Sequence, residues 1–292
     1  MTRPCVHNVV LANESGRAEI CRRHEGGIGS SHEHVANSRP RRPVRAAAVA
    51  APRGHPATAS ECVGCGHGEG GGAAGFPVVA TTSAGVAATL GYEDEERAPR
   101  RRDARRRCAD REGCRGARDG RREAGYGREP AELVSALRSV GAAGCNLEDT
   151  DHAAGALRDP VRHAEWLRAV RSAASEVSYP LVINARDHVF LGPLLAGSGP
   201  GTQGGLVPDA LRRASAYLEA GVDCVYPIGL WETGARRRFT TEVRGPVNVV
   251  RLPQTPALAD LAALGVARVS WGPFLHLGAI AHFEEQLAAL QE

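Results

Sequence analysis

Charged side chains stand at the ends of two short apolar runs in the second half of the chain. Glu148 and Asp149 close a run that begins at Gly144, and Arg186 and Asp187 close a later one. A carboxylate can bind a cation or carry a proton, and an arginine can hold a carboxylate with two parallel hydrogen bonds. At the carboxyl ends of barrel strands such residues favour a functional site. The alternatives are an N-cap, a surface salt bridge or, for Arg186 and Asp187, a structural ion pair.

The elements that must position these residues are six short apolar runs separated by helical patterns. Such runs are typical of buried parallel strands, and they cover 76–82, 144–148, 181–185, 224–228, 247–251 and 267–271. First-turn prolines and glycines after the pattern predict helices over 130–140, 159–174, 208–220, 257–264 and 274–290. The alternation indicates parallel βαβ units. A closed (β/α)8 barrel needs eight strands and an open doubly wound sheet can use six, so the count leaves both open.

Two stretches of the chain lack this order. Residues 1–72 are irregular and rich in Arg, His, Gly, Pro and Ser, whereas residues 100–122 hold 11 arginines and almost no apolar side chains. We therefore predict an irregular segment, 1–72, out of frame or disordered, followed by one α/β domain, 73–292, which contains an out-of-frame, insert-like stretch at 100–122.

Several short motifs resemble, in order and spacing, those of the isocitrate lyase / phosphoenolpyruvate mutase superfamily. They are Phe76-Pro-Val-Val-Ala-Thr-Thr-Ser-Ala-Gly, Leu90-Gly-Tyr-Glu-Asp, Glu123-Ala-Gly-Tyr-Gly, Gly144-Cys-Asn-Leu-Glu-Asp, Ile183-Asn-Ala-Arg-Asp and Pro246-Val-Asn-Val. The similarity is greatest to the phosphoenolpyruvate phosphonomutase-like and carboxyvinyl-carboxyphosphonate phosphorylmutase-like branch. The resemblance implies an α/β fold, a (β/α)8 TIM-type barrel with its site at the carboxyl ends of the strands.

The resemblance also implies a cofactor and roles for individual residues. It implies Mg²⁺, a hard ion that takes oxygen ligands and keeps waters, beside an enolate whose charge needs a cation. Carried onto this chain, the metal ligands are Asp94, Glu123 and Glu148, the substrate-binding residues are Ser83, Ala84, Gly85 and Arg186, and the catalytic residues are Arg186 and Asn248. Asn248 is expected at the end of strand seven.

Two departures from the family pattern coincide with the two irregular stretches. The family has an acid where Arg121 stands, and its first strand, ending Pro-Asn-Ala-Trp-Asp, has no counterpart before residue 73. One permitted coding of residues 60–72, read one base later, encodes Pro-Asn-Ala-Trp-Asp. Residues 100–122, shifted likewise, can encode a helix, a strand and an Asp in place of Arg121. We therefore expect compensating frameshifts, so that strands one and three are corrupted in this sequence.

The resemblance leaves the reaction open. After Asp149 the chain has neither the Cys-Gly-His loop of the lyases nor the Lys- and Asn-bearing loop of the mutases. We expect a Mg²⁺-dependent lyase or phosphonomutase-like enzyme that acts on C–C or P–C bonds next to a 2-oxo acid. A catalytically inactive member without the metal-binding Asp is the alternative. An Arg-rich nucleic-acid-binding protein is disfavoured, because residues 100–122 lack interleaved aromatics.

Partners and location are expected from composition and resemblance. No run of about 18 apolar residues exists, and no secretory signal opens the chain, so we expect a cytoplasmic protein without a membrane or nucleic-acid partner. The expected partners are a small-molecule carboxylate substrate and further copies of the chain, bound through an amphipathic helix over 274–290. Four histidines are interpreted as bystanders of the site, namely His152, His163, His188 and His276.

Overall fold

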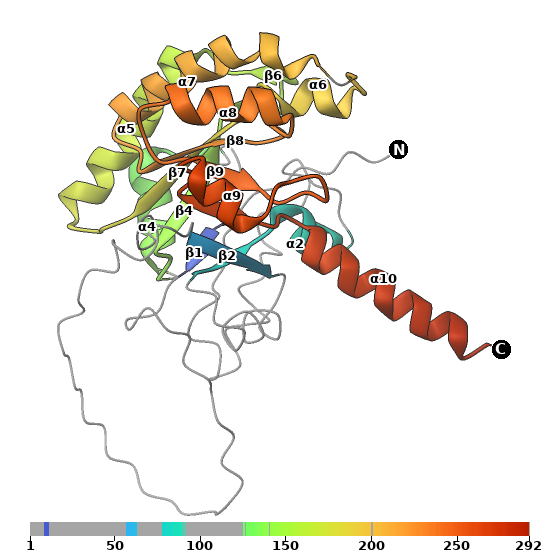
Figure 1. Ribbon diagram of the computed structural model, residues 1–292. Coiled ribbons are helices and arrows are strands. Elements are labelled where there is room, and N and C mark those ends of the chain that lie inside the picture. The colour runs from blue at the N-terminus through green and yellow to red at the C-terminus, as the bar shows by residue number, and fades with distance from the viewer. Residues whose placement is uncertain are drawn as a thin grey trace, which may run out of the picture.

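The computed structural model of the chain describes residues 9–11, 57–62, 78–89, 91, 125, 127–139, 141–199 and 201–291 (Figure 1). Among these residues, eight strands form one sheet and two more form a small hairpin. The strands of the sheet are β1 (Val9–Leu11), β2 (Ala57–Cys62), β3 (Val78–Thr81), β4 (Gly144–Glu148), β7 (Val182–Asp187), β8 (Cys224–Pro227), β9 (Asn248–Val250) and β10 (Arg268–Ser270). The hairpin pairs β5 (Thr150–Asp151) with β6 (Ala156–Leu157).

The sheet has the strand order of a (β/α)8 barrel. It runs β8-β7-β4-β1-β3-β2-β10-β9, and the end strands β8 and β9 meet through one isolated bridge between Val225 and Val247 instead of a continuous ladder. All neighbouring strands are parallel except at β1, which runs antiparallel to both β3 and β4. Strand β2 therefore holds the place of barrel strand one, and β1 holds that of strand three.

All six strands predicted from the apolar runs form, as β3, β4, β7, β8, β9 and β10. The structure adds β1 and β2, which come from the segment interpreted as irregular, 1–72. This segment therefore contributes two strands to the sheet, and the described part of the chain fills all eight strand positions.

The predicted helices also form, and all but the last of them cover the outer face of the sheet (Figure 1). The predicted ones are α4 (Pro130–Ser139), α5 (Pro160–Glu176), α7 (Val207–Glu219), α9 (Leu258–Ala263) and α10 (Phe274–Ala289). Short apolar or polar segments that gave no clear periodicity form α2 (Ser83–Thr89), α6 (Leu191–Leu195), the 3-10 turn η2 (Gln203–Gly205) and α8 (Thr233–Glu242). Helix α5 begins as predicted, because the Asp159 carboxylate accepts hydrogen bonds from the backbone N–H groups of Val161 and Arg162, both at 3.0 Å.

The two faces of the strands differ in polarity, and this difference creates the site. On the outer face, apolar side chains pack against the helices in the main core, among them Leu147, Ile183, Val225, Val249 and Val269. The alternate positions carry buried polar side chains, namely Asn146, Glu148, Asn184, Arg186, Tyr226, Asn248, Arg268 and Ser270. Along β4 and β7 to β10, the interior of the barrel is therefore largely polar, which is unusual for a space that side chains normally fill with branched apolar residues.

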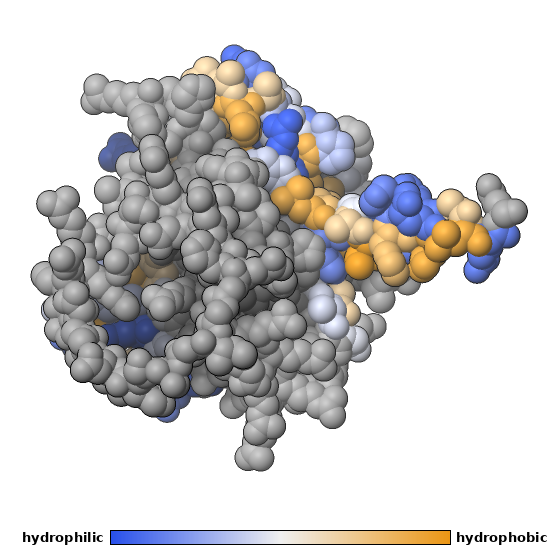
Figure 2. Space-filling model, turned by 90° about the horizontal axis from the view of Figure 1, so that it is seen from below, coloured by the Kyte–Doolittle hydropathy of each residue, from blue (hydrophilic) through white to orange (hydrophobic). Residues whose placement is uncertain are grey.

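Helix α10 extends away from the rest of the described structure (Figure 1). His276 is its one buried residue. Apolar and polar side chains lie next to each other along the helix (Figure 2), and six apolar side chains are each more than 40% exposed, namely Phe274, Leu275, Leu277, Ile280, Phe283 and Leu287. The expected length of this helix is confirmed, but the expected amphipathic pattern is wrong, because positions 274, 275 and 277 face different directions. None of the described helices is long and apolar enough to cross a membrane.

Candidate active site

Glu148 is the centre of the candidate site. It is the last residue of β4, and it is completely buried. His152, on the turn of the β5–β6 hairpin, donates a hydrogen bond from Nε2 to Oε1 of Glu148. The other carboxylate oxygen, Oε2, lies 3.2 Å from Nε2 of His188 and 3.7 Å from Nη1 of Arg186. Three cationic or potentially cationic side chains thus surround one carboxylate.

Arg186 lies beside Glu148 because β4 and β7 pair in parallel with these two residues in register. Its side chain is completely buried. Among the described residues, none of its three guanidinium nitrogens has a hydrogen-bond partner. A buried guanidinium without hydrogen bonds is costly, and a carboxylate ligand could accept two from it. The geometry therefore suits binding of an anion at Arg186.

His188 connects the ends of β4 and β7. Its Nδ1 lies 2.6 Å from the hydroxyl of Thr150, and its Nε2 faces Glu148. Burial lowers the pKa of His188 and the nearby Arg186 lowers this pKa further, whereas Glu148 opposes both effects. His152 and His188, which were interpreted as bystanders, both lie against Glu148.

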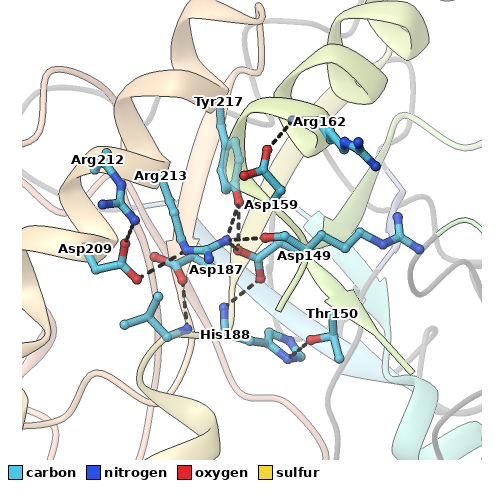
Figure 3. A network of polar contacts seen from close by, with 12 residues as sticks. Asp149, Thr150, Asp159, Arg162, Asp187, His188, Asp209, Arg212, Arg213 and Tyr217 are labelled. Carbon is cyan, nitrogen blue, oxygen red and sulfur yellow. Dashed lines mark hydrogen bonds and ion pairs between the residues drawn. The ribbon is translucent and has the colours of Figure 1, made fainter. Parts of the chain in front are cut away.

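A second polar cluster lies behind the site, on the outer face of the sheet (Figure 3). Asp149 accepts hydrogen bonds there from Arg213 and Tyr217 of α7 at 3.0 and 2.7 Å, and from the backbone N–H of His188 at 3.0 Å. Burial raises the pKa of the neighbouring Asp187 well above its usual value, and the charge of Asp149 adds to this rise. Burial and Asp149 also raise the pKa of Tyr217, so its hydroxyl remains a donor.

A third polar group lines the interior of the barrel. Asn248 donates a hydrogen bond to Oγ of Ser270 at 3.5 Å, and this hydroxyl donates to Oη of Tyr226 at 3.4 Å. Asn248 is the first residue of β9, so its expected place at the end of strand seven is wrong. Its carbonyl oxygen has no hydrogen-bond partner within the described residues, and it is completely buried.

The other three predicted substrate-binding residues lie in the first turn of α2, directly after β3. Ser83 begins this helix, Ala84 is half-buried and Gly85 is buried. Their backbone contact with a substrate carboxylate stays a prediction. Two predicted metal ligands, Asp94 and Glu123, lie outside the described residues, as does Arg121, which stands in place of the expected acid.

The described residues fit a Mg²⁺ site only in part. Glu148 is a buried carboxylate at the carboxyl end of a strand, where a metal shell would be expected. Within the described ranges, however, no group of three or more His, Cys, Asp or Glu side chains could hold a metal ion. Mg²⁺ can be held by one or two carboxylates plus waters, so Glu148 can supply one ligand of such a shell.

Known proteins with similar sequences and folds point to one family. The family model of phosphoenolpyruvate phosphomutase matches residues 69–291. An uncharacterized protein of Mycobacterium tuberculosis (strain ATCC 25618 / H37Rv) is 31% identical over 202 residues, which cover 68% of this chain and 71% of that protein.

Three solved structures share the fold. A candidate phosphonomutase from Burkholderia cenocepacia J2315 is 34% identical, with a TM-score of 0.67 and coverage of 84% of this chain and 96% of that one. A candidate lyase/mutase from the same organism is 27% identical, with a TM-score of 0.68 and coverage of 86% and 87%. A phosphonopyruvate hydrolase is 21% identical, with a TM-score of 0.66 and coverage of 85% of each chain, and it shows the fold alone. With the family model matching most of its length, the chain belongs to the phosphoenolpyruvate phosphomutase family.

Proposed function

We propose that this chain is a Mg²⁺-dependent enzyme of the lyase or phosphonomutase type, which acts on a small 2-oxo acid or enolpyruvate-type carboxylate. The observation that carries the proposal is the buried pair of Glu148 and Arg186, whose side chains lie 3.7 Å apart at the ends of neighbouring strands. A carboxylate that can bind a cation thus lies beside a guanidinium that can bind an anion. A chelating 2-oxo acid has the complementary arrangement of charge.

The chemistry would be divided among the residues of the site. A bound Mg²⁺ would supply positive charge for the enolate oxygen that develops on the substrate. Glu148, with the predicted ligands Asp94 and Glu123, would hold the ion, and Arg186 would hold and orient the substrate carboxylate. The complete burial of Glu148 and Arg186 excludes water, which strengthens both interactions.

Binding of oxalate, a mimic of the enolate, tests this proposal. Isothermal titration calorimetry of the full chain with Mg²⁺ and oxalate should show binding that depends on both partners. Arg186→Gln should weaken oxalate binding about 100-fold, because two charge-assisted hydrogen bonds are lost. No binding heat with the unchanged chain would overturn the proposal and favour the inactive family member. If oxalate binds, 2-oxo acids and phosphonates that resemble phosphonopyruvate are the first substrates to assay.

Arg171→Gln is a matched control for this experiment. Arg171 pairs with Asp223 and donates to the backbone carbonyl of Leu181 at 2.7 Å. These partners precede β8 and β7, so they lie at the opposite end of the sheet from Glu148. The control should lower stability without weakening oxalate binding. Equal losses of affinity in both variants would assign the effect to general destabilisation.

We also propose that the chain forms a homo-oligomer through α10. The support is the exposed apolar surface of this helix, on which Phe283 is 59% exposed. Light scattering should give a mass above that of one chain, and Phe283→Asp should lower it. His282→Asp adds the same charge at a neighbouring residue that is 71% exposed and should leave the mass unchanged. A monomeric wild-type chain would contradict this proposal.

A further inference from the structure

We infer that Arg213 and Tyr217 of α7 are positioning residues, which hold Glu148 and His188 in place by fixing Asp149 from behind the sheet. Glu148 and Asp149 are consecutive at the end of β4, so their side chains point to opposite faces. Asp149 faces Arg213 and Tyr217 of α7 (Figure 3), whereas Glu148 faces Arg186 and His188. The inference deepens the proposed function. Of its two tests, the measurement of oxalate binding depends on that function, and the measurement of hydrogen exchange does not.

Asp149 is a fully buried carboxylate whose two oxygens are both occupied. Oδ2 accepts hydrogen bonds from the Tyr217 hydroxyl at 2.7 Å and from Nη1 of Arg213 at 3.0 Å. Oδ1 accepts the backbone N–H of His188 at 3.0 Å. A buried charge must be paired and hydrogen-bonded, so this carboxylate has one well-defined position as long as both α7 side chains hold it.

The position of Asp149 determines the position of the His188 ring. The Asp149 backbone N–H donates to the carbonyl of Arg186 at 3.2 Å, and its carboxylate binds the His188 N–H. These two hydrogen bonds join Asp149, directly after β4, to Arg186 and His188 at the end of β7. The His188 ring is then held between the hydroxyl of Thr150 and Oε2 of Glu148.

Arg213 also fixes the hairpin that carries His152. Its Nη1 donates to the carbonyl of Arg158 at 3.0 Å, and the Arg158 N–H donates to the carbonyl of Asp149 at 2.7 Å. The β5–β6 hairpin lies between these two anchored residues, and it places His152 against Glu148. The contacts of Glu148 with His152, His188 and Arg186 therefore all come from segments that the α7 pair holds.

Tyr217→Phe is the direct test, and Tyr179→Phe is its matched control. The Tyr179 hydroxyl donates to the backbone carbonyl of Ala142, which precedes the opposite end of the same strand. Tyr217→Phe removes the hydrogen bond to Asp149 and the one that the hydroxyl accepts from Nη1 of Arg213 at 3.3 Å. Tyr179→Phe removes one hydrogen bond next to the same strand, and both changes should lower the unfolding temperature. Only Tyr217→Phe should disturb Glu148 and His188.

Two measurements separate positioning from general stability. In the ligand-free full chain, hydrogen exchange at the His188 amide should become about tenfold faster in Tyr217→Phe and stay unchanged in Tyr179→Phe. The Mg²⁺–oxalate affinity should fall about tenfold in the first variant alone, as is typical when support behind a metal ligand is removed. Arg213→Lys keeps the charge, but its side chain is shorter than the one that brings Nη1 to both Asp149 and Arg158. It should act in the same direction and serves if Tyr217→Phe does not fold.

The outcomes distinguish this inference from the proposed function. Equal exchange at His188 in Tyr217→Phe and Tyr179→Phe would overturn the positioning role, as would an unchanged affinity in Tyr217→Phe when the wild-type chain binds oxalate. If the wild-type chain binds no oxalate, the proposed function fails, and hydrogen exchange alone still decides the inference.

Discussion

The part of the sheet made by β4, β7 and β8 differs from the part made by β1, β2 and β3 in how the chain fills it. In the first, strands that follow one another along the sequence lie side by side and parallel, with helices between them. In the second, a three-residue strand from residues 9–11 is inserted antiparallel between β3 and β4. A regular βαβ succession would take that strand from the residues between α2 and α4. In this chain, β1 occupies the position of strand three.

The two irregular positions in the sheet are those of strands one and three, which the two segments that we interpret as frameshifted would fill. Strand β2 lies where the shifted reading puts strand one and the motif Pro-Asn-Ala-Trp-Asp, directly beside β3 and β10. Strand β1 holds the place that the shifted reading of 100–122 would fill. The sheet therefore keeps the eight strand positions of the family barrel, but this sequence departs from the family pattern at strands one and three.

Restoring the reading frame should have the largest effect on the difference between the two parts of the sheet. Resequencing across the codons for residues 45–127 should reveal missing or extra bases, and the corrected protein should carry Asp in place of Arg121. A third strand in parallel pairing and a continuous barrel should raise the unfolding temperature by about 10 °C and strengthen Mg²⁺ binding. Calorimetric unfolding and titration would measure both. The frameshift hypothesis would be contradicted if resequencing finds no missing or extra bases and a chain with the shifted reading is no more stable than the present one.

The stability of the regular part of the sheet, β4, β7 and β8 with their helices, should depend on pH through His163. This side chain of α5 is 1% exposed and packs against the rings of Trp166 and Tyr217. Burial lowers the pKa of His163 to about 4, from 6.5. Below pH 6.5, His163 binds a proton in the unfolded chain, whereas in the folded chain it binds this proton only near pH 4. This group should therefore lower the free energy of unfolding by about 3 kcal/mol as pH falls through that range.

His163→Phe isolates this contribution, because it keeps a ring in the same space and cannot take up a proton. Urea unfolding of both proteins between pH 7 and pH 4 should give a smaller loss of stability for the variant. Other groups, including Asp187, titrate in both proteins and cancel in the comparison. Parallel stability curves would contradict this prediction, because they would show that His163 has the same pKa in the folded and unfolded chains.

Val10→Pro tests whether β1 substitutes for strand three. Proline removes an N–H and disrupts pairing in the middle of a sheet, and Val10 pairs with both Ala80 and Gly144. The change should cost about 2 kcal/mol in the present chain. It should cost little in the frame-corrected chain, where the segment between α2 and α4 would fill this position. Equal costs in both chains would make β1 a genuine strand of the barrel.

The sequence predicted the regular part of the fold well because each of its elements carries a local signal. The apolar runs and the caps at Asp159 and Gly221 are examples. Helix α8 was missed because its sequence is mostly polar and only Ala235, Arg236 and Phe239 are buried. The antiparallel pairing of β1 could not be predicted, since it joins residues far apart in the sequence and depends on which position is left to fill.

The candidate site was predicted only where a residue's place on a strand determines its neighbours. The pairing of Glu148 with Arg186 follows from two parallel strands. The contacts of His152 and His188 with Glu148 depend instead on a hairpin of two-residue strands and on Asp149, and neither has a periodic signature. The spacing of four residues between Glu148 and His152 was the available signal, but outside a helix it does not by itself predict contact.

The N-cap of α5 gives the smallest expected effect and shows whether the two parts of the sheet unfold together. Asp159→Ala removes two hydrogen bonds to backbone N–H groups, and should cost about 1 kcal/mol. Asp159→Asn keeps a capping acceptor and should cost much less. If the sheet unfolds as one unit, the alanine variant shifts a single thermal transition. If the regular part unfolds independently, two transitions appear and only the one that contains α5 moves, so β1, β2 and β3 would then be a weakly coupled attachment to a stable core of β4, β7 and β8.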